Sequence, residues 1–146
     1  MPIFRCAECG RINRIKAKDA GPGPAKCGQC KSALDTSGKP QEVNTSQFKR
    51  AIRNAPVPVL LDVWAPWCGP CRMVAPVLES IGKERAGELM ILKVNSDENQ
   101  QLSSSLKISG IPTMLLFEGG KESARQSGAM PKPNLDAWLR SQGVSK

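Results

Sequence analysis

From residue 41 to the C-terminus, hydrophobic side chains fall in short continuous runs that alternate with segments of helical spacing. The runs at 57–64, 89–94 and 113–117 have strand length and few polar residues, which is typical of strands buried on both faces of a sheet. Gly119 and Gly120 predict a hairpin turn into an edge strand over 122–127. The pattern therefore predicts an α/β fold with a central sheet covered by helices on both faces.

Helices are predicted between and after these strands. Thr45 or Ser46 is a candidate N-cap for the first helix, and the longest helix spans 68–85, with a kink expected at Pro76. A weaker helix is predicted over 100–106 and a final one over 132–141. Hydrophobic positions at helical spacing predict the faces that pack on the sheet: Phe48 and Ile52 in the first helix, Met73, Val74, Val77, Leu78 and Ile81 in the longest, and Leu135, Trp138 and Leu139 in the last.

Residues 1–40 contain too few large hydrophobic side chains to fold by burial alone. They hold two Cys-x-x-Cys pairs, Cys6/Cys9 and Cys27/Cys30, with 17 residues between the pairs. This spacing is typical of a four-cysteine zinc site, in which each pair forms a tight knuckle. Because the chain has no histidine, the site would be all-cysteine. Zinc suits four thiolates best and a single iron is the second choice, whereas two local disulfides or free thiols are the alternatives without metal.

The two segments are predicted to be separate units. Residues 35–40 (Asp-Thr-Ser-Gly-Lys-Pro) have the composition of a linker. A zinc-binding module is therefore expected over 1–38 and a second domain over 39–146. Within the module, the Gly-Pro-Gly-Pro stretch at 21–24 predicts a loop between the knuckles.

Charge and composition narrow the function classes. The 146 residues include 21 Lys and Arg against 13 Asp and Glu, a formal charge of +8, and zinc with four thiolates would reduce it to about +6. This reduction weakens a nucleic-acid-binding interpretation of the basic module, in which Phe4 is the one aromatic residue. The hydrophobic runs are far shorter than the roughly 20 residues of a membrane-spanning helix, and the first residues lack the hydrophobic core of a secretory signal.

The third Cys-x-x-Cys pair lies at the predicted junction between a strand and the longest helix, in the sequence Trp67-Cys68-Gly69-Pro70-Cys71. Unpaired N–H groups and the dipole at a helix N-terminus stabilise a thiolate, which is the reactive form in thiol–disulfide exchange. Cys71 lies on the same face of the first turn as Cys68, and Pro70 suits a helix start. The pattern favours redox chemistry, with a metal site or an inert pair as the alternative.

This motif, with Asp62 in the preceding strand and Ile111-Pro112-Thr113 further on, resembles the thioredoxin family from residue 41 to the C-terminus. With the two N-terminal pairs added, the chain resembles the zinc-containing bacterial thioredoxins. The resemblance implies the thioredoxin fold, a central mixed sheet flanked by helices, with a small zinc-ribbon-like module at the N-terminus. It also implies a cytoplasmic protein-disulfide reductase, expected to be a monomer without nucleic-acid or membrane partners and without a bound organic cofactor.

In the reaction that the resemblance implies, the Cys68 thiolate attacks a disulfide of a protein substrate and Cys71 resolves the mixed disulfide. Thioredoxin reductase, an NADPH-dependent flavoprotein, would then reduce the Cys68–Cys71 disulfide. Asp62 would exchange a proton with the buried cysteine, and burial would raise its pKa toward neutral; a solvent-facing aspartate is the alternative. Lys93 matches a family lysine near that carboxylate, or is an ordinary lysine at a strand end.

The resemblance also implies a surface on which substrates dock. Pro112 would form a cis peptide bond facing the disulfide, and a substrate chain could pair with the backbone of Ile111. The expected docking residues are Trp67, Gly69, Pro70, Ile111, Pro112, Gly128 and Ala129.

Other functions compete with this interpretation. A thiol oxidase or isomerase usually carries a histidine between the two cysteines, so the Gly-Pro dipeptide favours a reductant. A nucleic-acid-binding zinc ribbon is a candidate from another class. The four N-terminal cysteines could also form a redox sensor that loses metal on oxidation, or a purely structural cap. Val63, where thioredoxins often have Phe, is a departure that affects core packing more than chemistry.

Overall fold

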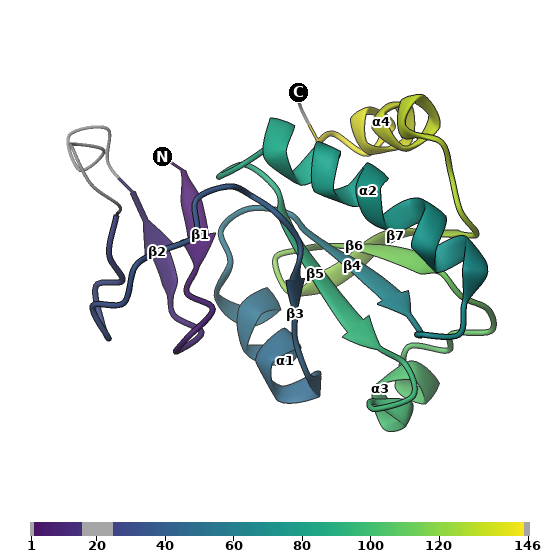
Figure 1. Cartoon of the computed structure of the whole chain (residues 1–146), viewed down its shortest axis with the longest axis horizontal. Helices are drawn as coiled ribbons and strands as arrows, with labels where there is room; N and C mark the ends of the chain where they lie inside the picture. The colour runs from purple at the N-terminus through teal and green to yellow at the C-terminus, as the bar shows by residue number, and fades with distance from the viewer. Residues whose placement is uncertain (1, 16–24, 145–146) are drawn as a thin grey trace.

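The computed structural model describes residues 2–15 and 25–144, so the loop predicted at 21–24 lies outside the described residues. Its N-terminal part is a hairpin of two short strands, and the rest alternates strands with helices (Figure 1). The elements in chain order are β1 (Ile3–Arg5), β2 (Ile12–Arg14), β3 (Gln41–Glu42), α1 (Thr45–Asn54), β4 (Val59–Trp64), α2 (Gly69–Glu84), β5 (Met90–Asn95), α3 (Gln100–Ser105), β6 (Thr113–Glu118), β7 (Lys121–Ser127) and α4 (Lys132–Ser141).

Five of these strands form one mixed sheet in the order β3-β5-β4-β6-β7. Strands β3, β5 and β4 run parallel, whereas β6 is antiparallel to both β4 and β7. Helices α1 and α3 cover one face, where Leu61 and Leu92 are buried, and α2 and α4 cover the other, where Leu60 and Ile91 are buried (Figure 1). Because successive strand residues point to opposite faces, two covered faces account for the continuous hydrophobic runs. The predicted α/β fold is confirmed.

Local side-chain chemistry sets where the elements begin. Asn44, not the predicted Thr45 or Ser46, caps α1: its side chain accepts the Gln47 backbone N–H (2.9 Å), and the Gln47 side chain accepts the Asn44 backbone N–H (2.9 Å). This reciprocal pair is a capping box. Strand β4 begins directly after Pro58, which has no N–H to donate to the ladder.

The sheet-facing side of α2 differs from the prediction at one position. Val74, Leu78 and Ile81 are fully buried, as predicted, and Val77 is half-buried, but Met73 is 71% exposed. The prediction for Met73 was wrong because it lies between the sheet-facing residues Cys71 and Val74 and so points away from that face. None of the described helices is long and apolar enough to cross a membrane.

The N-terminal hairpin packs at the end of the sheet opposite the start of α2 (Figure 1). The Ile3 N–H donates to the Gly87 carbonyl (2.9 Å), just before β5, and the Arg50 guanidinium of α1 donates to the Cys9 carbonyl (2.6 Å). Arg5 and Gln41 form two hydrogen bonds, one between side chains (2.8 Å) and one from the Gln41 amide to the Arg5 carbonyl (3.0 Å). These contacts fix the hairpin to the larger sheet.

A buried ion pair joins α2 to α4. The Arg85 guanidinium, with a side chain 1% exposed, donates to Asp136 (2.7 Å), which also pairs with Lys132 (2.9 Å). We expect Asp136→Ala to lower the free energy of unfolding by about 3 kcal/mol, because it leaves a buried charge without a partner. Asp35→Ala removes an exposed pair with Lys39 and should cost less than about 1 kcal/mol. Urea unfolding measures both, and equal losses would contradict the distinction.

Candidate functional site

Cys68 and Cys71 form a disulfide where β4 ends and α2 begins, with their Cα atoms 5.3 Å apart. Cys68 is the N-cap of α2, and its sulfur accepts the backbone N–H of Cys71 (3.2 Å). A thiolate at Cys68 would therefore receive a hydrogen bond at the positive end of the helix dipole, which lowers the proton affinity of a thiol. The pair is arranged for reversible thiol–disulfide exchange.

Hydrophobic side chains surround this pair on the protein side and extend to the surface. Ala65 is buried with the two cysteines, and Trp64 and Ile111 pack against them. Trp67 is 68% exposed, and its indole N–H donates to the Asp97 carboxylate (3.0 Å). Because large exposed hydrophobic residues often mark interaction surfaces, the exposed Trp67 and Met73 indicate one next to the disulfide.

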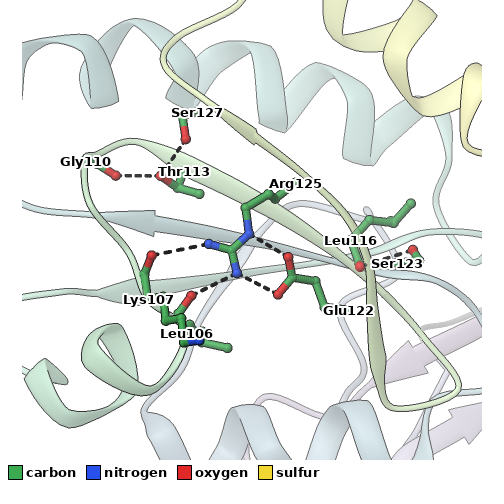
Figure 2. A network of polar contacts seen from close by, with 9 residues as sticks. All are labelled: Leu106, Lys107, Gly110, Thr113, Leu116, Glu122, Ser123, Arg125 and Ser127. Atoms are coloured by element: carbon green, nitrogen blue, oxygen red, sulfur yellow. Dashed lines mark hydrogen bonds and ion pairs between the residues drawn. The ribbon is translucent and has the colours of Figure 1, made fainter.

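The loop before β6 brings Pro112 into this region. The Ile111–Pro112 peptide bond is cis, as the resemblance implies. The Thr113 hydroxyl donates to the Gly110 carbonyl (2.5 Å), and Arg125 of β7 donates to the carbonyls of Leu106 (2.8 Å) and Lys107 (3.4 Å) at the start of the loop (Figure 2). Arg125 is held in turn by Glu122 (2.6 Å). Arg125 of β7 thus holds the beginning of the loop that carries Pro112, and Thr113 at the start of β6 holds its end.

The residues expected to dock substrates differ in how accessible they are. Ile111 is half-buried and Pro112 is buried. The exposed members are Trp67, Gly69, Pro70, Gly128 and Ala129. Accessible contact area therefore comes from the α2 N-terminus and the β7–α4 loop, whereas Pro112 is buried and offers little accessible surface.

Asp62 lies in β4 and is 1% exposed, which excludes a solvent-facing aspartate. Its side chain is on the face that α2 covers, because Leu60, two residues earlier, packs against Val74 and Leu78 of that helix. Neither carboxylate oxygen has a hydrogen-bond partner among the described residues. Burial raises the pKa of Asp62 to about 7, although the positive charge of Lys93 opposes the rise. A carboxyl group with this pKa can take and return a proton at neutral pH.

Three charged side chains lie in register across the parallel strands. Asp62 of β4 is paired with Lys93 of β5, and Lys93 is paired with Glu42 of β3. Paired residues on neighbouring strands point to the same face, so all three lie on the α2 side of the sheet. The Lys93 ammonium lies 4.8 Å from the centre of the Trp64 ring, and the Glu42 carboxylate accepts the Trp64 indole N–H (3.0 Å) and the Asn95 backbone N–H (3.1 Å).

The other four cysteines come together in the N-terminal module. Cys6 and Cys30 have their sulfurs 3.7 Å apart, Cys9 and Cys27 have theirs 3.6 Å apart, and all four sulfurs lie within 4.8 Å of one another. Sulfurs bound tetrahedrally at about 2.3 Å would lie roughly 3.8 Å apart, so the cluster has the dimensions of a metal site. The structure describes all four of these cysteines, and none of them is in a disulfide.

Hydrogen bonds favour the thiolate form of one ligand in this cluster. The Gln29 backbone N–H (3.4 Å) and the Asn13 amide (3.6 Å) donate to the Cys27 sulfur. Backbone donors at Cys30 and Gln29 and the Asn13 side chain hold the pKa of Cys27 below its usual value. Such donors around the ligands orient them and support the charge of a metal–thiolate centre. The four cysteines can therefore hold a metal ion.

Sequence reasoning found the cysteines and Asp62 but missed the partners that hold the site. Glu42 was not predicted because its role depends on strand pairing between β3 and β5, which no local pattern reveals. Asp97 and Arg125 were missed because each acts on a residue of another element. The hairpin signal of Gly119 and Gly120 predicted the edge strand that carries Arg125 but not the role of that side chain.

Comparisons with known proteins agree with this geometry. The family model described as "Thioredoxin" matches residues 39–141. The chain is 47% identical over 98 residues to "Thioredoxin 1" of Nostoc sp., covering 67% of this chain and 92% of that protein. It is 38% identical over 140 residues to "Thioredoxin C-3" of Corynebacterium nephridii, covering 96% and 94%. The chain belongs to the thioredoxin family and is a thiol–disulfide oxidoreductase that acts as a protein-disulfide reductase.

Proposed function

We propose that Cys68 is the attacking cysteine and Cys71 the resolving one. The observation that carries this assignment is the position of Cys68 as the N-cap of α2, where its sulfur accepts a backbone N–H. Both cysteines are buried in the disulfide form, and Cys71 lies inside the first turn, on the side of the helix that faces the sheet. The sulfur that receives the helix dipole and the N–H bond is the better thiolate, and its neighbour is positioned to attack it from within.

The proposed exchange needs the two cysteines, the substrate disulfide and protons from solvent. The Cys68 thiolate attacks one sulfur of a substrate disulfide; a Cys68–substrate bond forms, the substrate S–S bond breaks, and its electron pair leaves with the other substrate sulfur, which takes a proton from solvent. Cys71 then loses its proton and attacks Cys68. The Cys68–Cys71 disulfide forms, and the second substrate sulfur leaves as a thiolate and is protonated. The substrate gains two electrons and the pair loses two.

We infer that Asp62 accepts the proton of Cys71 in the second step. Asp62 lies on the sheet face beneath α2, and Cys71 begins the row of buried α2 residues that continues with Val74 and Leu78 above Leu60. Because β4 runs toward the α2 N-terminus, Asp62 lies two residues nearer to the disulfide than Leu60 does. A pKa of about 7 makes Asp62 a base near neutral pH without histidine. Lys93 acts on Asp62 by charge rather than by touching the reacting sulfurs.

We propose that substrates dock on the surface formed by Trp67, Gly69, Pro70, Ile111, Pro112, Gly128 and Ala129. Trp67 and the exposed residues of the α2 N-terminus supply apolar area. The loop at Ile111, held by Thr113 and Arg125, supplies backbone for pairing with an extended substrate chain. Protein substrates, rather than small disulfides alone, are the expected class.

The proposed electron donor is thioredoxin reductase, the NADPH-dependent flavoprotein that generally reduces members of this family, and the proposed location is the cytoplasm. The test is NADPH oxidation by a bacterial thioredoxin reductase with insulin as the disulfide substrate. We expect turnover that depends on the chain, and a monomer by light scattering. Absence of turnover with dithiothreitol as well would contradict the reductase assignment, whereas turnover with dithiothreitol alone would contradict only the donor.

We further propose that the chain is of the zinc-containing type, with a zinc module over 1–38 and a thioredoxin domain over 39–146. Cys6, Cys9, Cys27 and Cys30 would hold one zinc ion. Bound zinc supplies a cross-link that ties the hairpin together in place of a hydrophobic core. Leu34 is the largest side chain buried with Cys6 and Cys27, which supports this role.

The proposed zinc site is tested by measuring the metal content and by removing one of its ligands. We expect one zinc per chain by elemental analysis, and Cys27→Ser to lose nearly all of it, because three thiolates and a hydroxyl bind zinc poorly. Hydrogen exchange should then speed up in β1 and β2 but not in β4 or β5, and insulin reduction should stay within about twofold. Iron in place of zinc, or full protection of β1 and β2 without metal, would contradict the proposal.

A further inference from the structure

Glu42 occupies a position that the catalytic scheme so far does not use. It belongs to β3, the two-residue edge strand, and is exposed to solvent. In the sheet it is the outermost of three charged residues in register, followed by Lys93 and then Asp62. Its carboxylate nevertheless makes specific contacts. Both oxygens accept the Trp64 indole N–H (3.0 and 3.3 Å), and one also accepts the Asn95 backbone N–H (3.1 Å). An edge carboxylate with these donors is fixed in place rather than free in water.

Trp64 connects Glu42 to the redox pair. Its side chain packs against the cluster of Ala65, Cys68 and Cys71, and its indole N–H donates to Glu42. The face of the same ring receives the Lys93 ammonium at 4.8 Å from the ring centre, a distance typical of a cation–π contact. Glu42 therefore fixes the ring on which the cation next to Asp62 rests.

Lys93 lies between two carboxylates and forms an ion pair with neither. Its strand neighbours are Asp62 on one side and Glu42 on the other, yet among the described residues it forms no ion pair. The positive charge of Lys93 acts on both carboxyl groups, and it lowers the pKa of each against the effect of burial. A single cation shared in this way makes the proton affinity of Asp62 depend on the charge of Glu42.

We propose that Glu42 is a positioning residue for the proton transfer at Asp62: its negative charge and its bond to Trp64 hold Lys93 away from a direct pair with Asp62, which leaves that carboxylate able to bind a proton at neutral pH. The proposal rests on the role inferred above for Asp62 and extends it to the sheet edge. If Glu42 lost its charge, Lys93 would be free to pair with Asp62, and the carboxylate form of Asp62 would be favoured.

The surroundings of Asp62 contain few other charges that could have this effect. Asp62 is paired with Lys93 of β5 and with Met114 of β6, and Lys93 is paired in turn with Glu42 of β3. Helix α2, whose first turn holds the Cys68–Cys71 disulfide, covers this face of the sheet. Glu98, in the turn after β5, acts by charge on Glu42. It is absent from the charges that act on Asp62, so Glu98 offers a control carboxylate of the same charge in the neighbourhood of Glu42.

The experiment follows the Asp62 carboxyl carbon by NMR in the oxidised protein, where neither active-site cysteine titrates. We expect Glu42→Gln, which keeps an oxygen acceptor for Trp64 but removes the charge, to lower the pH midpoint of Asp62 by about half a unit or more. Glu98→Gln should leave the midpoint unchanged. An unchanged midpoint in Glu42→Gln, or an equal shift in Glu98→Gln, would overturn the proposal.

A second variant separates charge from packing. Glu42→Leu removes both the charge and the Trp64 bond, and we expect its midpoint to fall at least as far as that of Glu42→Gln. A fall confined to Glu42→Leu would assign the effect to the Trp64 bond alone and would overturn the role proposed for the Glu42 charge. The role of Asp62 itself is tested independently, because Asp62→Asn should slow release of substrate from the mixed disulfide; normal release would contradict the proposed function but not the NMR result.

Discussion

Replacing Cys68 by serine should abolish insulin reduction, lowering the rate by roughly a thousandfold or more because the nucleophile is gone. Serine keeps the size of the side chain and can still cap α2, so the fold and the position of Cys71 should be unchanged. The measurement is turbidity or NADPH consumption in the coupled assay at equal protein concentration. Cys27→Ser is a matched control, since it removes one thiol from the same chain at a distance from the disulfide.

Cys71→Ser tests the order of the two cysteines. This variant should attack a substrate disulfide normally and then stop, so that a covalent adduct through Cys68 accumulates and is seen by intact mass. Cys68→Ser should give no adduct under the same conditions. An adduct formed by Cys68→Ser and not by Cys71→Ser would reverse the assignment of attacking and resolving residues.

Asp62→Asn should stabilise the oxidised protein at alkaline pH by about 4 kcal/mol and not at pH 4. The pKa of Asp62 is raised from 3.8 to about 7 by burial, so the folded protein holds a proton that the unfolded chain releases between these values. Stability contributed by the neutral form is thus lost as pH rises from about 4 to 7, at about 1.4 kcal/mol per unit. The amide has the same shape and never ionises.

Urea unfolding at several pH values between 4 and 9 measures this difference. The variant and the parent should have equal stability at the acid end, diverge through neutral pH and run parallel above about pH 8. Glu79→Gln, at an exposed position of α2, controls for the change in net charge. A constant difference at all pH values would show that the pKa of Asp62 is the same in the folded and the unfolded protein. That result would remove the basis for its role as a base.

The long elements were predictable from the sequence, because each is specified by its own residues. Strand β4 reads as a continuous hydrophobic run since it is covered on both faces, and Asp62 was identifiable as a charge inside that run. The Cys-x-x-Cys spacings likewise carry their chemistry within four residues.

Features that depend on contacts between distant segments could not be predicted in this way. Strands β1, β2 and β3 are two or three residues long and have no hydrophobic period, so only their pairing defines them. The row of Glu42, Lys93 and Asp62 exists only because two parallel ladders share β5. Arg85 gave no signal either, because its burial requires Asp136 from α4.

The placement of the two cysteine groups at opposite ends of the sheet limits thiol–disulfide exchange within the chain. Strands β4 and β5 have six residues each and span about 20 Å. A thiol must reach bonding distance of a disulfide to exchange with it, so the four clustered thiols are out of range of the Cys68–Cys71 bond. A chain with six cysteines can thus pass electrons only to and from other molecules, without scrambling its own pairings.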